Sequence, residues 1–303
     1  MLDCLIIGAG PAGLTAAIYL ARYRRDICLV DAGSSRVKLI SSTHNLSGFP
    51  DGIAGRELLQ RLSDQAALYG VAAAQARIDS LALEDGNFIA TSGTRQWKAR
   101  TVILATGVKD LHPDIAGLEQ ATLAGLIRWC PICDGFEAMD QSIGIISPPG
   151  PGAGHALFLR TYSDRITLLA SADEAGMSSA DRSKLEAAGV EIVTEAIVSM
   201  RPRLDEKCVL VELRDGSSRR FDVVYPMYGT NVQSQLATTL GASRNEDGDL
   251  VVDEGQRTSL PGLYAVGDVV CALNQISVGI GHAAVAATRI HNELPSNPRA
   301  QVD

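Results

Sequence analysis

The sequence predicts an α/β fold arranged as two domains. Its 303 residues are enough for roughly two domains with hydrophobic cores of their own. A hydrophobic share of 46% and 29 glycines fit a soluble α/β protein with many tight turns. The decisive observation is at the N-terminus, where a strand, a glycine-rich turn, a helix and a second strand follow one another. This order is typical of a dinucleotide-binding unit.

The N-terminal unit carries the G-x-G-x-x-G fingerprint in the setting that the fingerprint requires. Residues 5–7 form a short apolar strand, residues 8–13 (GAGPAG) the turn, and residues 14–22 an apolar helix. A second apolar strand, residues 27–30, ends at Asp31. The alternative is a plain glycine turn in an unliganded domain, and the acid at the strand end argues against it.

The small residues of this turn have distinct physical roles in dinucleotide binding. Gly8 allows the tight turn, Gly10 lets a pyrophosphate approach the backbone, and Gly13 lets the helix pack closely on the strand. The helix N-terminus offers N–H groups and the positive end of its dipole to phosphate. We therefore expect a dinucleotide to be bound by Gly8, Gly10, Ala12, Gly13 and Asp31, the last through ribose hydroxyls.

A second motif, CPICDG at residues 130–135, indicates redox chemistry. Thiols at the spacing of Cys130 and Cys133 can close a small-ring disulfide that opens and re-forms easily. The carboxylate of Asp134 is placed to manage the proton that thiolate chemistry needs. A zinc half-site is one alternative, but no second CxxC or Cys/His pair supplies further ligands, and we expect no metal. Two buried cysteines are the other alternative.

Charge and hydropathy exclude several classes of partner. The net charge is −8 and no basic run occurs, so neither nucleic acid nor an anionic membrane is expected as a partner. No apolar stretch reaches the roughly 20 residues of a membrane span. The N-terminus reads as a first strand and not as a signal peptide. We therefore expect a cytoplasmic protein, in which a CxxC motif is more often catalytic than structural.

Two later segments separate FAD from NAD as the expected dinucleotide. Residues 101–107 (TVILATG) form a strand that runs into a small-residue turn. Residues 258–268 (TSLPGLYAVGD) form a strand that ends in Gly-Asp, before a glycine-punctuated helix over residues 279–290. These segments resemble the FAD domain of flavoprotein disulfide reductases that have two dinucleotide domains. With CPICDG between them, nearly the whole chain resembles a low-molecular-weight thioredoxin reductase.

The resemblance implies the domain organisation. The fold would consist of two Rossmann-like, three-layer ββα domains, with the second inserted into the first. Residues 1–114 and 229–303 would form a discontinuous FAD-binding domain. Residues 115–228 would form the inserted NADPH-type domain that carries the CxxC motif. A homodimer is expected on the same ground.

The resemblance also assigns flavin-binding roles by motif. Asp268 would hold the ribityl or phosphate end of the flavin, and Gln275 and Ile276 belong to the segment beside the pyrimidine edge of the ring. Asn45 lies in the loop that reaches the flavin from the other side, although turn formation is an alternative role for it. The residues assigned in this way are Asn45, Thr106, Gly107, Gly267, Asp268, Gln275 and Ile276.

A mechanism follows from the same resemblance. FAD would pass two electrons to the Cys130–Cys133 disulfide, which would then reduce the disulfide of a small molecule or of a protein such as a thioredoxin-like partner. Cys133 would face the flavin, and Cys130 would attack the substrate. Asp134 would shuttle the proton, and it could also act as a helix N-cap.

Three residues near these motifs are expected to be structural. Trp129 is expected to pack in a core, with docking of a partner as the alternative. Arg128 is expected to be a solvated surface arginine, with thiol activation or an acidic partner as the alternative. His282 is expected to be a helix histidine with satisfied hydrogen bonds, with a catalytic base as the alternative.

The inserted domain departs from the pattern of relatives that use pyridine nucleotide. After its first strand, residues 142–146, the three small positions fall on Ser147, Pro149 and Gly152. Prolines in this loop cannot donate N–H groups to a pyrophosphate. After the second strand, residues 166–169, no basic residue stands where relatives hold the 2′-phosphate of NADPH. Without these charge-assisted hydrogen bonds, NADPH should be a poor ligand.

The electron donor and the direction of the reaction stay open from sequence. Branches that resemble this family draw electrons from ferredoxin or hold a second flavin, which would be a second FAD in the degenerate nucleotide site. One alternative is an NAD(P)H-dependent thioredoxin reductase with an atypical loop, which would favour NADH and use Asp173 as ribose acceptor. Others are a flavin dithiol oxidase that passes electrons to oxygen, and a redox sensor without turnover.

Overall fold

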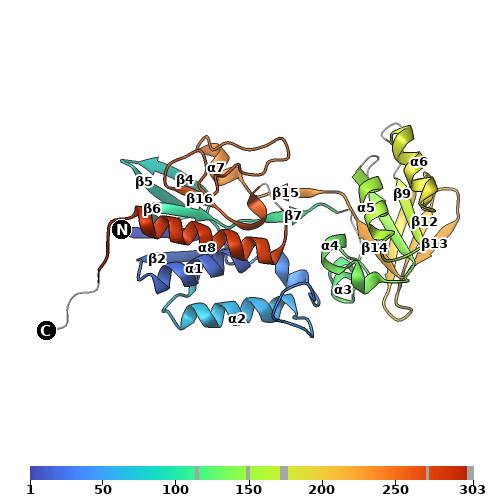
Figure 1. The fold of residues 1–303 in the computed structure, drawn as a ribbon, viewed down its shortest axis with the longest axis horizontal. Helices are drawn as coiled ribbons and strands as arrows, with labels where there is room; N and C mark the ends of the chain where they lie inside the picture. The colour runs from blue at the N-terminus through green and yellow to red at the C-terminus, as the bar shows by residue number, and fades with distance from the viewer. Residues whose placement is uncertain (113–115, 148–150, 171–176, 271–272, 299–303) are drawn as a thin grey trace. The chain divides into compact units, whose positions relative to one another are not determined.

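The chain folds into two compact units, and each unit has β-sheet and helices of its own (Figure 1). The first unit consists of Met1–Lys38, Gly55–Lys109 and Asn231–Asp303, and the second of Leu39–Ala54 and Asp110–Thr230. The segment Leu39–Ala54, predicted as part of the FAD-binding domain, is thus grouped with the second unit. The computed structural model describes residues 1–112, 116–147, 151–170, 177–270 and 273–298.

The first unit is built on one mixed sheet. Its strands are β1 (Leu2–Ile7), β2 (Ile27–Asp31), β3 (Ala73–Gln75), β4 (Ser80–Glu84), β5 (Asn87–Ser92), β6 (Arg95–Leu104) and β16 (Leu263–Ala265). They are arranged in the order β3-β2-β1-β6-β5-β4, and β16 also pairs with β6. Strand β1 pairs in parallel with β2 and β6, whereas β4, β5 and the first half of β6 form an antiparallel meander.

Helices cover one face of this sheet. Helices α1 (Pro11–Arg22) and α8 (Ile276–Glu293) lie side by side there, and α2 (Gly55–Ala67) packs on α1 (Figure 1). The residues of β1 that face these helices are Cys4 and Ile6, both fully buried. Because β1 is buried on both faces, it reads as a continuous apolar run in the sequence.

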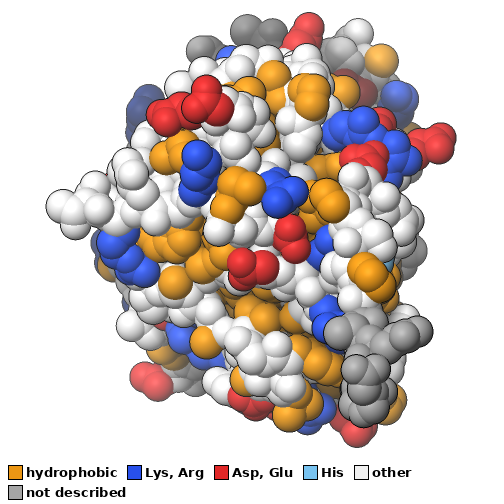
Figure 2. Space-filling view, turned by 90° about the vertical axis from the view of Figure 1, so that its left-hand side faces the viewer, with side chains coloured by type: hydrophobic (Ala, Val, Ile, Leu, Met, Phe, Trp, Pro, Cys, Tyr) orange, Lys and Arg blue, Asp and Glu red, His pale blue; other side chains and the backbone are white. Residues whose placement is uncertain are grey.

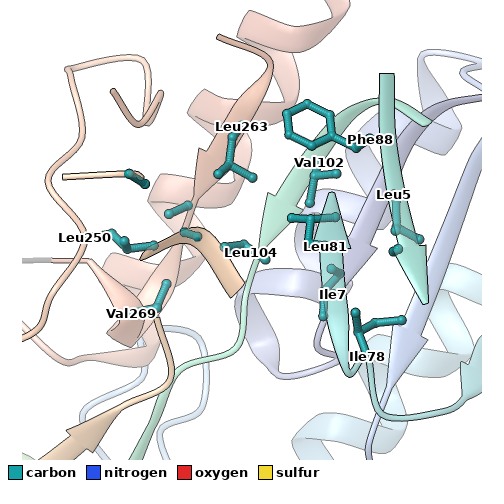
Figure 3. Close-up of a cluster of buried hydrophobic side chains, with 14 of the residues drawn as sticks. Leu5, Ile7, Ile78, Leu81, Phe88, Val102, Leu104, Leu250, Leu263 and Val269 are labelled. Atoms are coloured by element: carbon teal, nitrogen blue, oxygen red, sulfur yellow. The ribbon is translucent and has the colours of Figure 1, made fainter. Parts of the chain in front are cut away.

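The opposite face of the sheet carries the second core of the unit. Figure 3 shows Leu5 of β1, Phe88 of β5 and Leu263 of β16 in this core, together with Leu250 from the C-terminal part of the chain. These residues come from segments far apart in the sequence. The core therefore joins the N-terminal strands to the segment that returns after the second unit.

The second unit contains two sheets. Its strands are β8 (Ile143–Ser147), β9 (Ile166–Ala170), β10 (Glu191–Val193), β11 (Ile197–Arg203), β12 (Cys208–Leu213), β13 (Ser218–Phe221) and β14 (Val223–Pro226). A parallel sheet has the order β10-β9-β8-β14, and an antiparallel sheet has the order β11-β12-β13. The helices of this unit are α3 (Leu118–Leu123), α4 (Pro131–Asp134), α5 (Pro151–Leu159) and α6 (Ser179–Ala187).

Two features of the second unit position the CxxC motif. Ile127 forms an isolated parallel bridge with Val224, so the chain that leads into the motif runs along β14. The chain enters this unit through β7 (Val108–Asp110) and leaves through β15 (Thr230–Val232), and these two strands pair with each other. The segment that leads into the CxxC turn is therefore held on the central parallel sheet of its own unit.

The surface has no area dominated by one charge on the face that Figure 2 shows. Acidic and basic side chains are interspersed there with hydrophobic ones. In the described part of the chain, no helix combines the length and the apolar character needed to cross a bilayer.

Candidate functional site

The two cysteines of the CPICDG motif form a disulfide in one turn of helix. Cys130 is the N-cap of α4, and Pro131 occupies the first helical position, where its missing N–H costs no hydrogen bond. The N–H of Cys133 donates to the carbonyl oxygen of Cys130 at 2.9 Å. This turn brings the cysteine Cα atoms to 5.2 Å, and the Cys130–Cys133 disulfide is present. The prediction of a disulfide at this motif is confirmed.

Asp134 has a partner that the sequence does not indicate. The hydroxyl of Tyr225, a fully buried residue of β14, donates to the Asp134 Oδ1 atom at 2.8 Å. The alternative role of Asp134 as a helix N-cap is wrong, because Asp134 is the last residue of α4 and Cys130 is its N-cap. A tyrosine in an apolar strand needs a hydroxyl partner, but nothing in the sequence indicates which residue that partner is.

The environment of Asp134 suits proton transfer. Burial raises the pKa of its carboxyl from 3.8 to about 6, while the positive charge of Arg128 and the hydrogen bond from Tyr225 oppose the rise. The negative charge of Glu137 adds to the increase in the pKa. A carboxyl with a pKa in this range can donate or accept a proton close to neutral pH.

Arg128 holds the end of the CxxC turn. Its guanidinium donates to the carbonyl oxygens of Gly125 at 3.1 Å, Asp134 at 2.7 Å and Glu137 at 3.4 Å. The expectation of a solvated surface arginine is wrong, because the side chain is half-buried and satisfies carbonyl groups before, at and after the C-terminal end of α4. Arg128 therefore fixes the backbone that carries Asp134.

Trp129 packs into the core of the second unit, as expected. Its ring lies against the buried cluster that includes Val209 and Val211 of β12, and it meets the ring of His112 edge-on at 5.9 Å. Its Nε1 atom is buried and has no hydrogen-bond partner among the described residues. The structural interpretation of Trp129 is thus confirmed.

Position 135, which follows Asp134, requires glycine because there is no space for a side chain. A Cβ atom at this position would lie 2.6 Å from the carbonyl oxygen of Pro131 and 2.7 Å from the ring of Tyr162. Its backbone is ordinary, with φ −63°, so the requirement is for the absence of a side chain. The sequence motif includes this glycine, but only the structure shows what it avoids.

The loop formed by Leu39–Ala54 contacts the segment after the CxxC motif. His44 Nδ1 lies 3.3 Å from Glu137 Oε1, and both side chains are partly exposed. Asn45 Oδ1 accepts a hydrogen bond from the hydroxyl of Thr43 at 2.9 Å, a local bond of the kind that the turn interpretation of Asn45 predicts. A flavin-contacting role for Asn45 stays a prediction.

The fingerprint turn in the first unit has the geometry that its glycines predict. Gly8 has φ +107°, and a Cβ atom there would lie 2.3 Å from the carbonyl oxygen of Ala105. A Cβ atom at Gly13 would lie 1.8 Å from the carbonyl oxygen of Gly8. At Gly10, the N-cap of α1, a Cβ atom would meet only the Ser35 hydroxyl at 3.6 Å. The turn therefore leaves room at its middle glycine, at a helix N-terminus, for a diphosphate.

Asp31 ties this turn to the end of β2. Its Oδ1 atom accepts from the N–H of Ala9 at 3.0 Å, and its Oδ2 atom accepts from the N–H of Gly33 at 2.9 Å. Each carboxylate oxygen can accept a second hydrogen bond. The predicted contact of Asp31 with ribose hydroxyls is thus compatible with the bonds that it makes within the turn.

Residues predicted from three distant motifs meet beside this turn. A Cβ atom at Gly267, whose φ is +74°, would lie 3.1 Å from Ala12 Cβ, and one at Gly279 would lie 3.3 Å from Gly267 Cα. The Gly-Asp motif, the N-terminus of α1 and the first turn of α8 therefore pack directly on one another. Asp268 lies 3.5 Å from the guanidinium of Arg36, a contact that the sequence analysis did not predict.

The remaining predicted flavin residues lie at the ends of secondary-structure elements. Gln275 is the N-cap of α8 and Ile276 is its first residue, so backbone N–H groups of this helix are available there. The hydroxyl of Thr106 donates to the carbonyl oxygen of Gln233 at 2.6 Å, and Gly107 has φ +63°. These positions are consistent with an FAD site in the first unit.

His282 of α8 does not have satisfied hydrogen bonds, contrary to the sequence-based expectation. Its Nδ1 atom is buried and has no partner among the described residues. Burial lowers the pKa of this histidine, and the negative charge of Asp268 opposes the change. The imidazole is therefore held toward its neutral form.

The degenerate nucleotide loop of the second unit is only partly described. Ser147 is fully buried at the end of β8, and a Cβ atom at Gly152 in α5 would lie 2.7 Å from Ser147 Cβ and 2.8 Å from Leu168 Cδ1. Gly152 thus allows α5 to approach β8, as the last small position of such a loop should. Pro149 and Asp173 lie outside the described residues.

No group of three or more His, Cys, Asp or Glu side chains that could hold a metal occurs in the described chain.

Comparison with known proteins identifies the family. Residues 2–289 match the family described as pyridine nucleotide-disulphide oxidoreductase. The chain belongs to this family. The chain is 31% identical to a thioredoxin reductase of Mycolicibacterium smegmatis, with 88% of each chain covered. It is 29% identical to a thioredoxin reductase of Listeria innocua, with 94% of this chain and 91% of the relative covered.

Solved structures confirm the fold. The thioredoxin reductase from Streptococcus pyogenes superposes with a TM-score of 0.89 at 24% identity, and 96% of this chain and 97% of that chain are covered. This likeness confirms the predicted fold class of Rossmann-like domains. Together with the family membership and the Cys130–Cys133 disulfide, it makes the chain an FAD-dependent disulfide oxidoreductase of the thioredoxin reductase type.

Proposed function

We propose that this enzyme moves electrons between FAD and a substrate disulfide through Cys130 and Cys133, and that its electrons come from a donor other than NADPH. Within this scheme Cys133 faces the flavin, Cys130 exchanges with the substrate, and Asp134 carries the proton. The proposed substrate is the disulfide of a thioredoxin-like protein or of a small molecule, and the enzyme acts as a homodimer.

FAD fits the convergence of motifs in the first unit. Several features of the first unit match the parts of a dinucleotide. They are the room at Gly10, the N-termini of α1 and α8, and the carboxylates of Asp31 and Asp268. Bound FAD would supply a carrier of two electrons for the disulfide. Proposed contacts come from Gly8, Gly10, Ala12, Gly13, Asp31, Asn45, Thr106, Gly107, Gly267, Asp268, Gln275 and Ile276.

The lack of a basic residue after β9 carries the proposal about the donor. The sequence there is Ala170-Ser171-Ala172, so no guanidinium or ammonium is available to the 2′-phosphate of NADPH. The prolines at positions 148 and 149 remove two N–H groups from the loop that would meet the pyrophosphate. Ferredoxin, or a second FAD in the vacated site, is the donor that we propose.

An anaerobic titration tests this proposal. The purified oxidised protein is titrated with NADPH and then with NADH, and the visible absorbance of the flavin is followed. We expect no bleaching by either nucleotide, full bleaching by dithionite, and bleaching by reduced ferredoxin or by a reduced free flavin. Prompt bleaching by NADPH at micromolar concentration would contradict the proposal and show a conventional reductase with an atypical loop.

An oxygen-uptake assay separates the reductase from a dithiol oxidase. The protein is incubated with a dithiol in air, and oxygen uptake is measured without any other acceptor. We expect slow uptake from a reductase. Rapid uptake with many turnovers would show that the enzyme works in the oxidising direction.

A further inference from the structure

Tyr225, a residue outside the CPICDG motif, hydrogen bonds to Asp134, which directly follows the second cysteine of the redox disulfide. Tyr225 is fully buried, and among the described residues its hydroxyl is the one side-chain group that hydrogen bonds to the Asp134 carboxyl. The phenol also lies 3.4 Å from the Asp134 carbonyl oxygen. The backbone of Asp134 is bound in turn, since its N–H reaches the carbonyl oxygen of Cys130 at 3.3 Å. Tyr225 thus holds the acid on the turn that carries both sulfurs.

We propose that Tyr225 positions the Asp134 carboxyl and sets the pH range in which it exchanges a proton with the Cys130–Cys133 pair. This inference rests on the proposed function, because it assumes that electrons pass between FAD and this disulfide. It assigns Tyr225 as a positioning residue that acts through Asp134.

The polarity of the hydrogen bond is fixed. Burial raises the pKa of Tyr225, and the negative charge of Asp134 raises it further, so the phenol stays protonated and donates throughout the working pH range. A donor to the carboxylate favours the charged form of Asp134 and lowers the pKa of its carboxyl. Tyr225 therefore opposes the effect of burial on the same carboxyl.

Charged groups around Asp134 shift the pKa of its carboxyl in opposite directions. Arg128 lowers the pKa of the Asp134 carboxyl, and Glu137 raises it. Glu137 Oε1 itself lies 3.3 Å from His44 Nδ1. Tyr225, in contrast to these charged groups, is neutral. Removal of its hydroxyl therefore changes the hydrogen bonding of Asp134 without changing the net charge.

The proton balance of disulfide reduction gives Asp134 its task. Breaking the Sγ–Sγ bond takes two electrons, which the reduced flavin supplies, and one proton, and it yields one thiol and one thiolate. The proton would come from the neutral Asp134 carboxyl, and the carboxylate left behind would take up the proton that leaves the reduced flavin with its two electrons. In the reverse direction the carboxylate would take a proton from the thiol as the Sγ–Sγ bond forms, and the flavin would take up two electrons and that proton.

A pH profile of this internal electron transfer tests the inference. The FAD-loaded enzyme is mixed rapidly with one equivalent of dithionite without oxygen, and reoxidation of the flavin by the disulfide is followed. In the wild type the rate should fall as the pH rises through the pKa of Asp134. In Tyr225→Phe the fall should move about one pH unit toward alkaline values, because a donor to the carboxylate is lost. The Asp134→Asn variant should lack this fall in rate, and so should the double variant that combines Tyr225→Phe with Asp134→Asn.

A matched control removes a similar bond elsewhere. Tyr264 is also buried, and its hydroxyl donates to the Glu293 carboxylate at 2.6 Å in the first unit. Tyr264→Phe should leave the pH profile unchanged. A shift of equal size in Tyr264→Phe would mean that the effect is a general loss of packing, and it would overturn the inference.

A second variant covers the case in which Tyr225→Phe does not fold. Incorporation of 3-fluorotyrosine at position 225 keeps the shape and the bond but makes the phenol a stronger donor. The fall in rate should then move toward acidic pH, opposite to its shift in Tyr225→Phe. The role of Tyr225 is overturned if the fall in rate stays at the wild-type pH in both variants. If Tyr225→Phe does not fold, an unchanged pH in the 3-fluorotyrosine variant alone overturns it. If the wild type shows no electron transfer between flavin and disulfide, the proposed function fails instead.

Discussion

The two sulfurs of the disulfide have different proposed tasks, and serine substitutions separate them. Cys130 precedes α4 as its N-cap, whereas Cys133 lies within the helix. In Cys130→Ser we expect turnover with a disulfide substrate to be lost, while the Cys133 thiolate, which we propose faces the flavin, is retained. This thiolate should give a long-wavelength absorption band. Cys133→Ser is the matched control and should show no band, and the opposite result would exchange the two assignments.

Asp134 is expected to lower the stability of the protein at neutral pH. Its pKa in the folded protein is about 6, raised from 3.8 by burial, so the folded state binds a proton more tightly than the unfolded state does. Stability should therefore fall as the pH rises from about 4 to about 6 and stay lower above that range. The effect is at most about 3 kcal/mol, since one pH unit corresponds to about 1.4 kcal/mol.

Urea unfolding of Asp134→Asn at several pH values measures this effect. The variant should lack the decline in the free energy of unfolding between pH 4 and pH 6, so its advantage over the wild type should appear at pH 7 and vanish near pH 4. Equal differences between the two proteins at both pH values would show that the pKa of Asp134 is not raised.

At the scale of elements, the four-residue helix α4 depends on the glycine that follows it. A methyl group at position 135 would collide with the Pro131 carbonyl oxygen, a backbone atom, and with the ring of Tyr162. Gly135→Ala should therefore cost about 1–3 kcal/mol of stability and displace the CxxC turn. Thermal unfolding and the rate of disulfide reduction by dithiothreitol measure the two consequences.

Gly154→Ala in α5 is the matched control for this substitution. A Cβ atom at Gly154 would have nothing within 4 Å, and alanine has the higher helix propensity. The control should therefore be neutral or more stable by up to about 1 kcal/mol. Equal losses in both variants would show that the space at Gly135 is not the cause.

The elements that could be predicted from the sequence are those whose signal is local. The strand–turn–helix unit at the N-terminus is encoded within about thirty residues, and the structure gives Gly8 and Gly13 the close contacts that their positions in the motif predict. The CPICDG turn is equally local. Arg128 was misjudged because its acceptors are carbonyl groups, and their direction depends on the turn and not on residue type.

Contacts between distant elements could not be predicted in this way. Tyr225 and Asp134 are 91 residues apart, and they meet because β14 pairs with β8 and the chain before α4 runs along β14. The contact of Arg36 with Asp268 likewise joins distant segments. A single sequence carries no signal for such pairs, whereas the fold class needs only the apolar periodicity and the glycine turns.

At the scale of the whole molecule, the proposed FAD contacts are concentrated in one of the two units. All of them except Asn45 lie in the first unit, which has its own core on both faces of its sheet. The redox disulfide and its Asp134–Tyr225 pair lie in the second unit, which has separate cores. The cofactor and the disulfide therefore depend on different cores for their stability.

This division predicts that FAD stabilises the two units unequally. A ligand that binds only the folded state adds about 2.7 kcal/mol at a free concentration of about a hundred times its Kd, and this gain should go to the first unit. Hydrogen exchange of the FAD-free and FAD-loaded protein measures the effect separately for β1 and α8 in the first unit and for β8 and β12 in the second. We expect protection by FAD to rise strongly in the first pair of elements and little in the second. Equal gains in both pairs would contradict the assignment of the FAD site to the first unit.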